Sequence, residues 1–280
     1  MIVIEDIGEM QAWSGPGPVV LVPTMGALHA GHGKLVEHGR KLAGTEGSLV
    51  VSVFVNPTQF GPGEDFEAYP RAFADDCALC EAAGADVVFH PSAGAMYHGD
   101  SSVTVAEASL TGTLCGPSRP GHFDGVCTVV AKLFNIARPD IAVFGKKDYQ
   151  QLAVLRRMGR DLNFPVEIAG AETVREDDGL AMSSRNRYLD EAQRQQAPAI
   201  REALLAIADS DLESASERIA AAREILAKKA PLGKVDYLEI VDRETMEKVE
   251  AADRPALAAA AVFFGKARLI DNIEVDPVGS

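Results

Sequence analysis

The sequence predicts an α/β protein: a doubly wound parallel sheet with a second, smaller α+β domain. From Pro18 onward, short and uniformly apolar runs alternate with segments of helical periodicity, a pattern typical of parallel strands covered by helices on both faces. After about Val174 the chain changes to alanine-rich helical segments followed by strand-like runs, which indicates a separate unit. We therefore expect two domains, residues 1–173 and residues 174–280.

Five apolar runs are expected to be the strands of the parallel sheet, with helices between them. The strands are PVVLVP at 18–23, SLVVSVFV at 48–55, DVVF at 86–89, DIAVFG at 140–145 and PVEIAG at 165–170. The helices are expected near residues 31–42, 72–83, 126–137 and 148–162. This alternation is Rossmann-like, and in such sheets ligands bind beyond the carboxyl ends of the strands. Polar residues that directly follow a strand are therefore the first functional candidates.

The C-terminal part is expected to hold two helices and two or three antiparallel strands. The helical segments are residues 191–208 and 213–230, and the strand-like runs are VDYLEIVD at 235–242 and AAAAVFFGKARLIDNIEV at 258–275. A polar connecting segment, residues 173–190, lies where a cleft between the two domains is expected. Domain interfaces are favoured ligand sites, so this segment is a second functional candidate.

Composition excludes several classes of protein. The 280 residues are 47% hydrophobic and include 27 basic and 41 acidic side chains, for a formal net charge of −14. A broad nucleic-acid-binding surface is therefore not expected, and any anionic ligand has to be bound by local groups. The first residues are acidic and no long apolar window follows, so we expect a cytoplasmic protein without a membrane span. Four cysteines fit free thiols, and the Cys77/Cys80 pair fits a helix better than a metal site.

Two histidines lie close together in PTMGALHAGH, residues 23–32, directly after the first expected strand. Glycines at 26 and 31 let the backbone approach a ligand, and a helix start with free N–H groups favours an anion such as phosphate. His29 and His32 share one side of the first helical turn, where both can donate to phosphate oxygens. Capping or buried histidines without a ligand are the alternative, which this short pattern does not exclude.

The His-x-Gly-His spacing after the first strand resembles the nucleotidyltransferase superfamily, which includes class I aminoacyl-tRNA synthetases. The wider set of motifs is similar to the pantothenate synthetase family. PTMGALHAGH, VSVFVNPTQF, SRPGHFDGV, FGKKDYQQL and GLAMSSRNRYLD occur in this order, and VDYLEI and ARLIDN fit as well. The resemblance covers residues 18–272.

This resemblance implies a ligase that condenses pantoate with β-alanine at the expense of ATP. Pantoate is adenylated with release of pyrophosphate, and the β-alanine amine then displaces AMP. Mg²⁺ is expected with ATP, the first domain is expected to bind ATP and pantoate, the C-terminal domain to act as a lid, and the chain to form a homodimer. Two alternatives stay open: a related nucleotidyltransferase that keeps the nucleotide on its product, and a catalytically silent nucleotide-binding protein.

The resemblance assigns catalysis to His32 as proton donor, together with His29 and Lys147. An imidazole that titrates near neutrality can protonate a leaving oxygen, and a lysine supplies a compact positive charge for phosphates. The resemblance places Asp148 in the nucleotide site, and a helix N-cap is the alternative role for this residue. The implied ATP-binding residues are Met25, Gly26, Ala27, Leu28, His29, Ala30, Gly31, His32, Gly145, Lys146, Lys147, Asp148, Val174, Met182, Ser183, Ser184 and Arg185.

Substrate binding is assigned by the resemblance to neutral amides. Gln59 and Gln151 follow two different strands, and an amide can donate to a carboxylate oxygen and accept from a hydroxyl, which suits pantoate. Asn56 is expected to position pantoate or β-alanine. Arg119 is a candidate for the β-alanine carboxylate or the phosphates.

Metal ligands and nucleophiles are not assigned to any residue. Mg²⁺ needs few protein ligands when it binds through ATP, and although Asp75 and Asp76 carry suitable oxygens, we predict no protein metal site. Chemistry through an acyl-adenylate needs no protein nucleophile, so Cys115 and Cys127 are not expected to be catalytic. The chain also departs from the family pattern twice, with Cys115 and Lys146 where glutamate is common.

Overall fold

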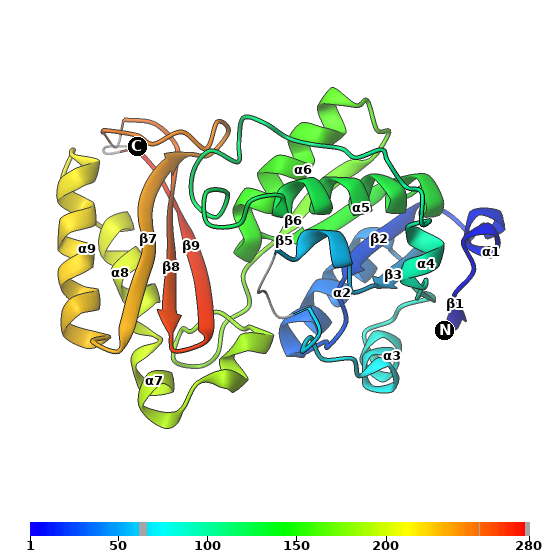
Figure 1. Cartoon of the computed structure of the whole chain (residues 1–280), viewed down its shortest axis with the longest axis horizontal. Helices are drawn as coiled ribbons and strands as arrows, with labels where there is room; N and C mark the ends of the chain where they lie inside the picture. The colour runs from blue at the N-terminus through cyan, green and yellow to red at the C-terminus, as the bar shows by residue number, and fades with distance from the viewer. Residues whose placement is uncertain (62–65, 252, 278–280) are drawn as a thin grey trace. The chain divides into compact units, whose positions relative to one another are not determined.

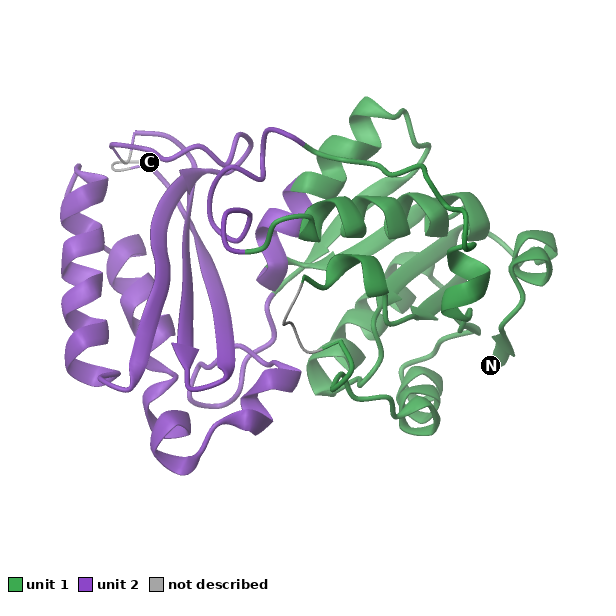
Figure 2. Ribbon diagram, in the orientation of Figure 1, with its two compact units in different colours: residues 1–107, 119–146, 154–172 green, residues 108–118, 147–153, 173–280 purple. Residues whose placement is uncertain are grey.

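A computed structural model of the chain describes residues 1–61, 66–251 and 253–277; residues 278–280 of the expected C-terminal domain lie outside the described residues. The chain forms two compact units (Figure 2). Unit 1 comprises Met1–Glu107, Arg119–Lys146 and Val154–Glu172, and unit 2 comprises Ala108–Ser118, Lys147–Ala153 and Thr173–Ser280. Two short segments from the first part of the chain, at 108–118 and 147–153, thus belong to the same unit as the C-terminal part.

The strands of unit 1 form a parallel sheet in the order β1-β4-β3-β2-β5-β6 (Figure 1). They are β1 (Ile2–Ile4), β2 (Val19–Thr24), β3 (Ser48–Val53), β4 (Val87–Phe89), β5 (Ile141–Gly145) and β6 (Glu167–Ala171). The predicted doubly wound α/β fold is confirmed. The edge strand β1, which pairs with β4, was not among the expected strands, because three residues are too few for a recognisable apolar run.

Helices connect these strands and cover the sheet. They are α1 (Ile7–Ala12), α2 (Ala30–Ala43), the short 3₁₀ helix η1 (Pro57–Gln59), α3 (Phe73–Ala82), α4 (Ala93–Met96), α5 (His122–Ala137), the 3₁₀ turn η2 (Lys146–Asp148) and α6 (Tyr149–Asp161). Side chains of α2 and α3 pack with Val20, Val22 and Val51 in one buried cluster. Leu21 and Val50, which point to the opposite face, are also completely buried. Both faces are therefore covered, which explains why the strands are apolar throughout.

Unit 2 contains an antiparallel sheet in the order β7-β8-β9 and the helices that pack on it. Its elements are the 3₁₀ helix η3 (Ser184–Tyr188), α7 (Glu191–Gln196), α8 (Ala199–Ala208), α9 (Ala215–Lys229), β7 (Gly233–Asp242), β8 (Ala256–Phe264) and β9 (Ala267–Val275). The single helix expected over 191–208 is wrong. It is interrupted before α8 because Pro198, which has no N–H to donate, stands at the N-cap of that helix.

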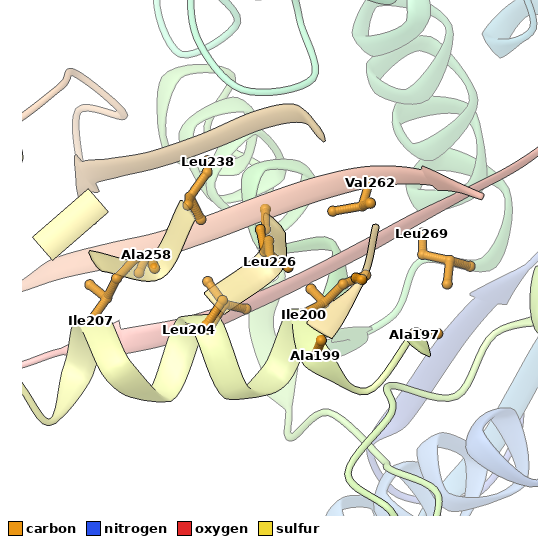
Figure 3. Close-up of a cluster of buried hydrophobic side chains, with 14 of the residues drawn as sticks. Ala197, Ala199, Ile200, Leu204, Ile207, Leu226, Leu238, Ala258, Val262 and Leu269 are labelled. Carbon is orange, nitrogen blue, oxygen red and sulfur yellow. The ribbon is translucent and has the colours of Figure 1, made fainter. Parts of the chain in front are cut away.

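The core of unit 2 lies between the sheet and the helices α8 and α9. Ile200, Leu204 and Ile207 come from successive turns of α8 and face the strands (Figure 3). The β8 residues that they meet include Ala258 and Val262. Small side chains on β8 leave room for branched side chains from the helices, so large and small residues interdigitate as in other well-packed cores.

Candidate functional site

The loop between β2 and α2 carries the expected histidine motif, and a buried carboxylate holds it. Asp76, only 2% exposed, accepts the N–H of Ala27 at 3.0 Å and that of Leu28 at 2.7 Å. Gly26 has φ +77°, and a Cβ there would lie 2.9 Å from the Asp76 carboxylate. Glycine is required at 26 for its backbone conformation and for this close approach. The loop after β2 is therefore fixed by α3, to which Asp76 belongs.

His29 and His32 cap the start of α2 through their rings. The Nδ1 atom of His29 accepts from the N–H of Gly31 at 3.1 Å, and the Nδ1 atom of His32 accepts from the N–H of His29 at 3.3 Å. The ring centroids are 4.1 Å apart. A backbone N–H can only donate, so each Nδ1 carries a lone pair and each neutral ring carries its proton on Nε2. Two adjacent Nε2–H donors result.

This arrangement differs in one respect from the expectation for the loop. The sequence predicts free backbone N–H groups at the helix start, whereas those of Ala27, Leu28, His29 and Gly31 are donated within the protein. The capping alternative for the histidines is supported, because each ring accepts a backbone N–H through Nδ1. A role in binding an anion stays a prediction, and it would use the Nε2 side of the rings.

Two amides after β3 form a buried pair. Asn56 and Gln59 are 1% and 9% exposed, and the Nδ2 group of Asn56 donates to Gln59 Oε1 at 3.1 Å and to the carbonyl of Gly125 at 3.1 Å. The Nε2 group of Gln59 points at the sulfur of Met25, 2.8 Å away. Gln59 therefore lies next to the first residue of the expected ATP-binding set.

The first turn of α5 supports Gln59 from the backbone side. A guanidinium only donates, so Arg119 donates to His122 Nε2 at 2.9 Å, and the Nδ1–H of His122 then donates to the carbonyl of Gln59 at 2.8 Å. A Cβ on Gly125 would lie 2.4 Å from the carbonyl oxygen of Thr58. The glycine lets α5 approach η1 closely. The SRPGHFDGV and NPTQF motifs thus meet in one place, and His122 is a contact that the sequence predictions missed.

The two lysines at the end of β5 have different surroundings. Lys146 pairs with Glu172 at 2.5 Å, so the positive charge that this chain has in place of the usual glutamate is balanced within unit 1. Lys147 Nζ lies 3.9 Å from the Asp148 carboxylate, and its backbone carbonyl accepts from Asn272 at 2.8 Å. In the part of the chain that the structure describes, the Asp148 carboxylate accepts no backbone hydrogen bond, which disfavours the N-cap alternative.

The two adjacent glutamines of DYQQL also have different surroundings. Gln150 is 5% exposed; its Nε2 donates to the carbonyls of Leu110 and Thr113, and its Oε1 accepts from the N–H of Cys115. It anchors the 108–118 segment within unit 2. Gln151 is half-buried and makes no hydrogen bond to any residue that the structure describes. Of the two amides, Gln151 is the one with its full capacity for a ligand.

The polar connecting segment, which carries the expected ATP-binding residues Met182 to Arg185, is anchored to β9. Val174 accepts the N–H of Met182 at 2.9 Å, and a β-bridge joins Arg175 to Ala181. Arg175 forms a bidentate ion pair with Asp271, at 2.8 and 3.0 Å, and that carboxylate is 4% exposed. Bidentate arginine–carboxylate pairs are geometrically specific. The ion pair therefore fixes the base of this loop, which the sequence predictions did not anticipate.

The tip of the same segment begins a 3₁₀ helix. Ser183 Oγ accepts the N–H of Arg185 at 3.2 Å and is the N-cap of η3. Asn186 donates to the Glu176 carboxylate and to the carbonyl of Ala181. The Met182–Arg185 stretch is thus a turn held at both ends, with two serines and an arginine brought together.

Cys115, the second departure from the family pattern, packs against a half-buried arginine. Its Sγ lies 3.4 Å from Tyr237 Oη and 3.6 Å from the Arg268 guanidinium, which also binds Asp236 at 2.7 Å. Burial, followed by the neighbouring Cys115, raises the pKa of Tyr237 well above its usual value. The phenol stays protonated, and Asp236 balances the charge of Arg268 without an acid at position 115.

The other thiols are poor nucleophiles. All four cysteines are free, and burial raises the pKa of Cys80 and of Cys127 to about 12. Burial also raises the pKa of Cys77. Because the thiolate is the reactive form, these positions are suited to packing, in agreement with the prediction that Cys127 is not catalytic.

Residues 1–61, 66–251 and 253–277 contain no group of three or more His, Cys, Asp or Glu side chains arranged to hold a metal ion. Both oxygens of Asp76 accept backbone N–H groups, so this carboxylate is occupied by the loop. Among the described residues, we also find no helix with the length and apolar character needed to cross a membrane.

The parallel sheet with a His-Ala-Gly-His turn after β2 defines a doubly wound α/β protein, in which ligands bind at the carboxyl ends of the strands. A narrower assignment follows from the whole sequence. Residues 2–274 match the family model of pantoate-beta-alanine ligase, and the chain belongs to this family. It is an enzyme of this type.

Relatives and solved structures agree with the assignment. The chain is 55% identical over 262 residues to the pantothenate synthetase of Akkermansia muciniphila, with 92% of each chain covered. Among solved structures, the pantothenate synthetase of Thermus thermophilus has a TM-score of 0.93 at 46% identity, covering 99% of this chain and 100% of that one. The pantoate-beta-alanine ligase of Francisella tularensis, complexed with beta-gamma ATP and beta-alanine, has a TM-score of 0.79 at 30% identity, covering 98% and 97%.

Replacing the loop-holding carboxylate tests its role. Asp76→Asn leaves one acceptor oxygen and turns an NH₂ group toward a backbone N–H, so we expect the free energy of unfolding to fall by about 1–3 kcal/mol. Urea denaturation measures this loss, and hydrogen exchange reports faster exchange at Ala27 and Leu28. Asp75→Asn, at an exposed neighbouring position, should change the stability by less than about 0.5 kcal/mol. Equal losses of stability in the two variants would contradict the role of Asp76 in holding the loop.

The raised pKa values predict slow alkylation of the buried thiols. With a pKa of about 12, Cys80 and Cys127 are about one part in 10⁴ thiolate at pH 8. Peptide mapping after treatment with iodoacetamide should find both residues unmodified in the folded protein and all four cysteines modified in urea. Rapid modification of Cys127 in the folded protein would show that its thiol is accessible and activated.

Proposed function

We propose that this enzyme condenses pantoate with β-alanine through a pantoyl-adenylate, using ATP and releasing first pyrophosphate and then AMP. The family assignment supports the overall reaction. The relative from Francisella tularensis, complexed with beta-gamma ATP and beta-alanine, supports ATP and β-alanine as substrates. The observation that carries most weight for the first step is that both imidazoles accept a backbone N–H through Nδ1, from which we infer that Nε2 carries the proton. No observation favours a transferase that keeps the nucleotide on its product.

His29 and His32 bind the phosphates of ATP in this proposal. Two Nε2–H donors on neighbouring rings can bond to phosphate oxygens, and such bonds strengthen as negative charge builds on the departing pyrophosphate. His32 donates its Nε2–H as a hydrogen bond to the leaving oxygen and keeps its proton, because a neutral ring that lost this proton would become an imidazolate. The Asp76 carboxylate, by holding Ala27 and Leu28, keeps these rings in place before the substrate arrives. Preorganisation of this kind is where most electrostatic catalysis comes from.

Positive and hydroxyl groups elsewhere complete the proposed phosphate contacts. Lys147 carries a charge that is only distantly paired, at 3.9 Å from Asp148. Ser183, Ser184 and Arg185 supply hydroxyl and guanidinium donors, and an arginine fork matches the geometry of phosphate oxygens. The remaining predicted ATP contacts, which are Met25, Gly26, Ala30, Gly31, Gly145, Lys146, Asp148, Val174 and Met182, belong to the same proposal.

Gln59 and Gln151 bind pantoate in this proposal. Gln59 turns its NH₂ group toward Met25, and a thioether is a weak acceptor that a substrate oxygen can replace. The free amide of Gln151 supports its role in the same way. Arg119 remains a proposed contact of the β-alanine carboxylate or the phosphates. For Asn56, all polar atoms of the side chain are bonded within the protein, which favours positioning over substrate contact.

Mg²⁺, a homodimer and a cytoplasmic location are the finer parts of the proposal. The metal supplies charge neutralisation of the β and γ phosphates. Because both oxygens of Asp76 accept backbone N–H groups, we expect the ion to be bound through ATP and water and not by this carboxylate. The free thiols fit a reducing compartment. Light scattering after gel filtration tests the dimer.

Omission of single substrates tests the reaction. Incubation with ATP, Mg²⁺, pantoate and β-alanine should give pantothenate, AMP and pyrophosphate by mass spectrometry. Without β-alanine, pyrophosphate and the pantoyl-adenylate should still form. A product that retains the nucleotide when all substrates are present would favour the transferase, and ATP binding without turnover would favour a silent binding protein.

His32→Ala tests the proposed hydrogen-bond donor to the leaving pyrophosphate. We expect adenylate formation to slow by about 10²-fold or more, since the hydrogen bond that strengthens in the transition state is lost. Rapid-quench measurement of pyrophosphate release gives this rate. His38→Ala, in a later turn of the same helix α2, is the matched control and should keep the wild-type rate. Unchanged pyrophosphate release in His32→Ala would remove the role given to this residue.

A further inference from the structure

The carboxamide oxygen of Asn56 receives hydrogen bonds from two neighbouring residues. Tyr97 Oη donates to it at 2.8 Å, Thr58 Oγ1 donates at 2.9 Å, and the backbone N–H of Thr58 donates at 3.3 Å. Burial is the main cause that raises the pKa of Tyr97. The phenol is therefore protonated at neutral pH and is available as a donor. Tyr97 follows α4 directly and is otherwise distant in sequence from the NPTQF motif.

Groups that can only donate or only accept decide which way the Asn56 amide faces. An amide can be turned over so that its oxygen and nitrogen exchange places. In the turned orientation, the NH₂ group of Asn56 would face the backbone N–H of Thr58, which can only donate. The observed orientation instead directs Nδ2 at two acceptors, the Gly125 carbonyl and Gln59 Oε1. The backbone N–H of Thr58 and the carbonyl of Gly125 therefore fix this orientation, and the hydroxyl groups of Tyr97 and Thr58 strengthen it by donating to Oδ1.

The orientation of the Asn56 amide determines the orientation of the Gln59 amide. Because Asn56 donates to Gln59 Oε1, the Gln59 amide has to present its NH₂ group on the opposite side, where Met25 Sδ lies. The side chain is 9% exposed, and no oxygen or nitrogen acceptor for this NH₂ group is present among the residues that the structure describes. A buried NH₂ group without an oxygen acceptor is costly. This favours a ligand oxygen as its partner.

We propose that Tyr97 and Thr58 are positioning residues for pantoate: through Asn56 they hold Gln59 as a hydrogen-bond donor to an acceptor oxygen of that substrate. The inference rests on the proposed function, in which Gln59 binds pantoate. It adds the direction of the hydrogen bond and two residues that do not touch the substrate. If the amide of Gln59 turned over, its carbonyl would face the substrate oxygen, and affinity for a carboxylate would fall.

A double-mutant cycle separates this role from ordinary packing. Steady-state kinetics are measured for the wild-type enzyme, Tyr97→Phe, Gln59→Ala and the double variant, with pantoate varied and ATP and β-alanine saturating. Tyr97→Phe should raise the KM for pantoate about fivefold, the effect of one lost hydrogen bond. The kcat and the KM for ATP should change less than about twofold. In the Gln59→Ala background, Tyr97→Phe should cause no further rise.

The outcomes distinguish failure of the inference from failure of the proposed function. If Gln59→Ala leaves the KM for pantoate unchanged, Gln59 does not bind pantoate and the proposed function of this residue fails. If Gln59→Ala raises the KM but Tyr97→Phe does not, the positioning role fails. Equal effects of Tyr97→Phe in both backgrounds would also overturn it, because the tyrosine would then act independently of Gln59.

A second variant keeps the test decisive if Tyr97→Phe folds poorly. Thr58→Val removes the other hydroxyl donor and preserves side-chain shape, so it should raise the KM for pantoate in the same way. Thr45→Val, at an exposed loop position, is the matched control and should leave every kinetic constant unchanged. Thermal unfolding of each variant shows whether it is folded. A folded Thr58→Val variant with the wild-type KM for pantoate would contradict the proposal.

Discussion

One carboxylate behind the β2–α2 loop determines the geometry of the histidine pair. Asp76 takes two consecutive backbone N–H groups, which holds the turn at Gly26 and Ala27 in its left-handed conformation. The chain then enters α2 with His29 as the N-cap. Because both rings accept backbone N–H groups through Nδ1, their remaining nitrogens are donors. A buried acid on one helix thus sets the hydrogen-bonding character of two imidazoles on another.

The amide cluster follows the same principle with neutral groups. His122 holds the Gln59 carbonyl, and Asn56 holds the Gln59 side chain. In both places, groups that can only donate or only accept start a chain of hydrogen bonds, and every later amide or imidazole has one consistent orientation. The residues closest to the proposed substrates are therefore oriented by residues that do not contact them.

Sequence patterns predicted the strands and helices that are long and uniformly apolar, and they missed β1 and the break before α8. The family resemblance, together with their positions after strand ends, made Gln59 and the histidines predicted site residues. Asp76, Tyr97, Asp271 and Gln150 were not recognised as supports. Their partners are backbone atoms or side chains far away in the sequence, and nothing in the local pattern of an acid, a phenol or an amide records such a partner. Local chemistry therefore indicates which residues act, and only the tertiary structure shows what orients them.

The tautomers of His29 and His32 are the most direct measure of this arrangement. Long-range ¹H–¹⁵N correlation spectra of protein labelled with ¹⁵N-histidine distinguish protonated from unprotonated ring nitrogens, with His29→Gln and His32→Gln variants giving the assignments. At a pH where the rings are neutral, both residues should show an unprotonated Nδ1 and a protonated Nε2, and Asp76→Asn should make this pattern less uniform. A protonated Nδ1 on either neutral ring would contradict the backbone capping on which the whole arrangement depends.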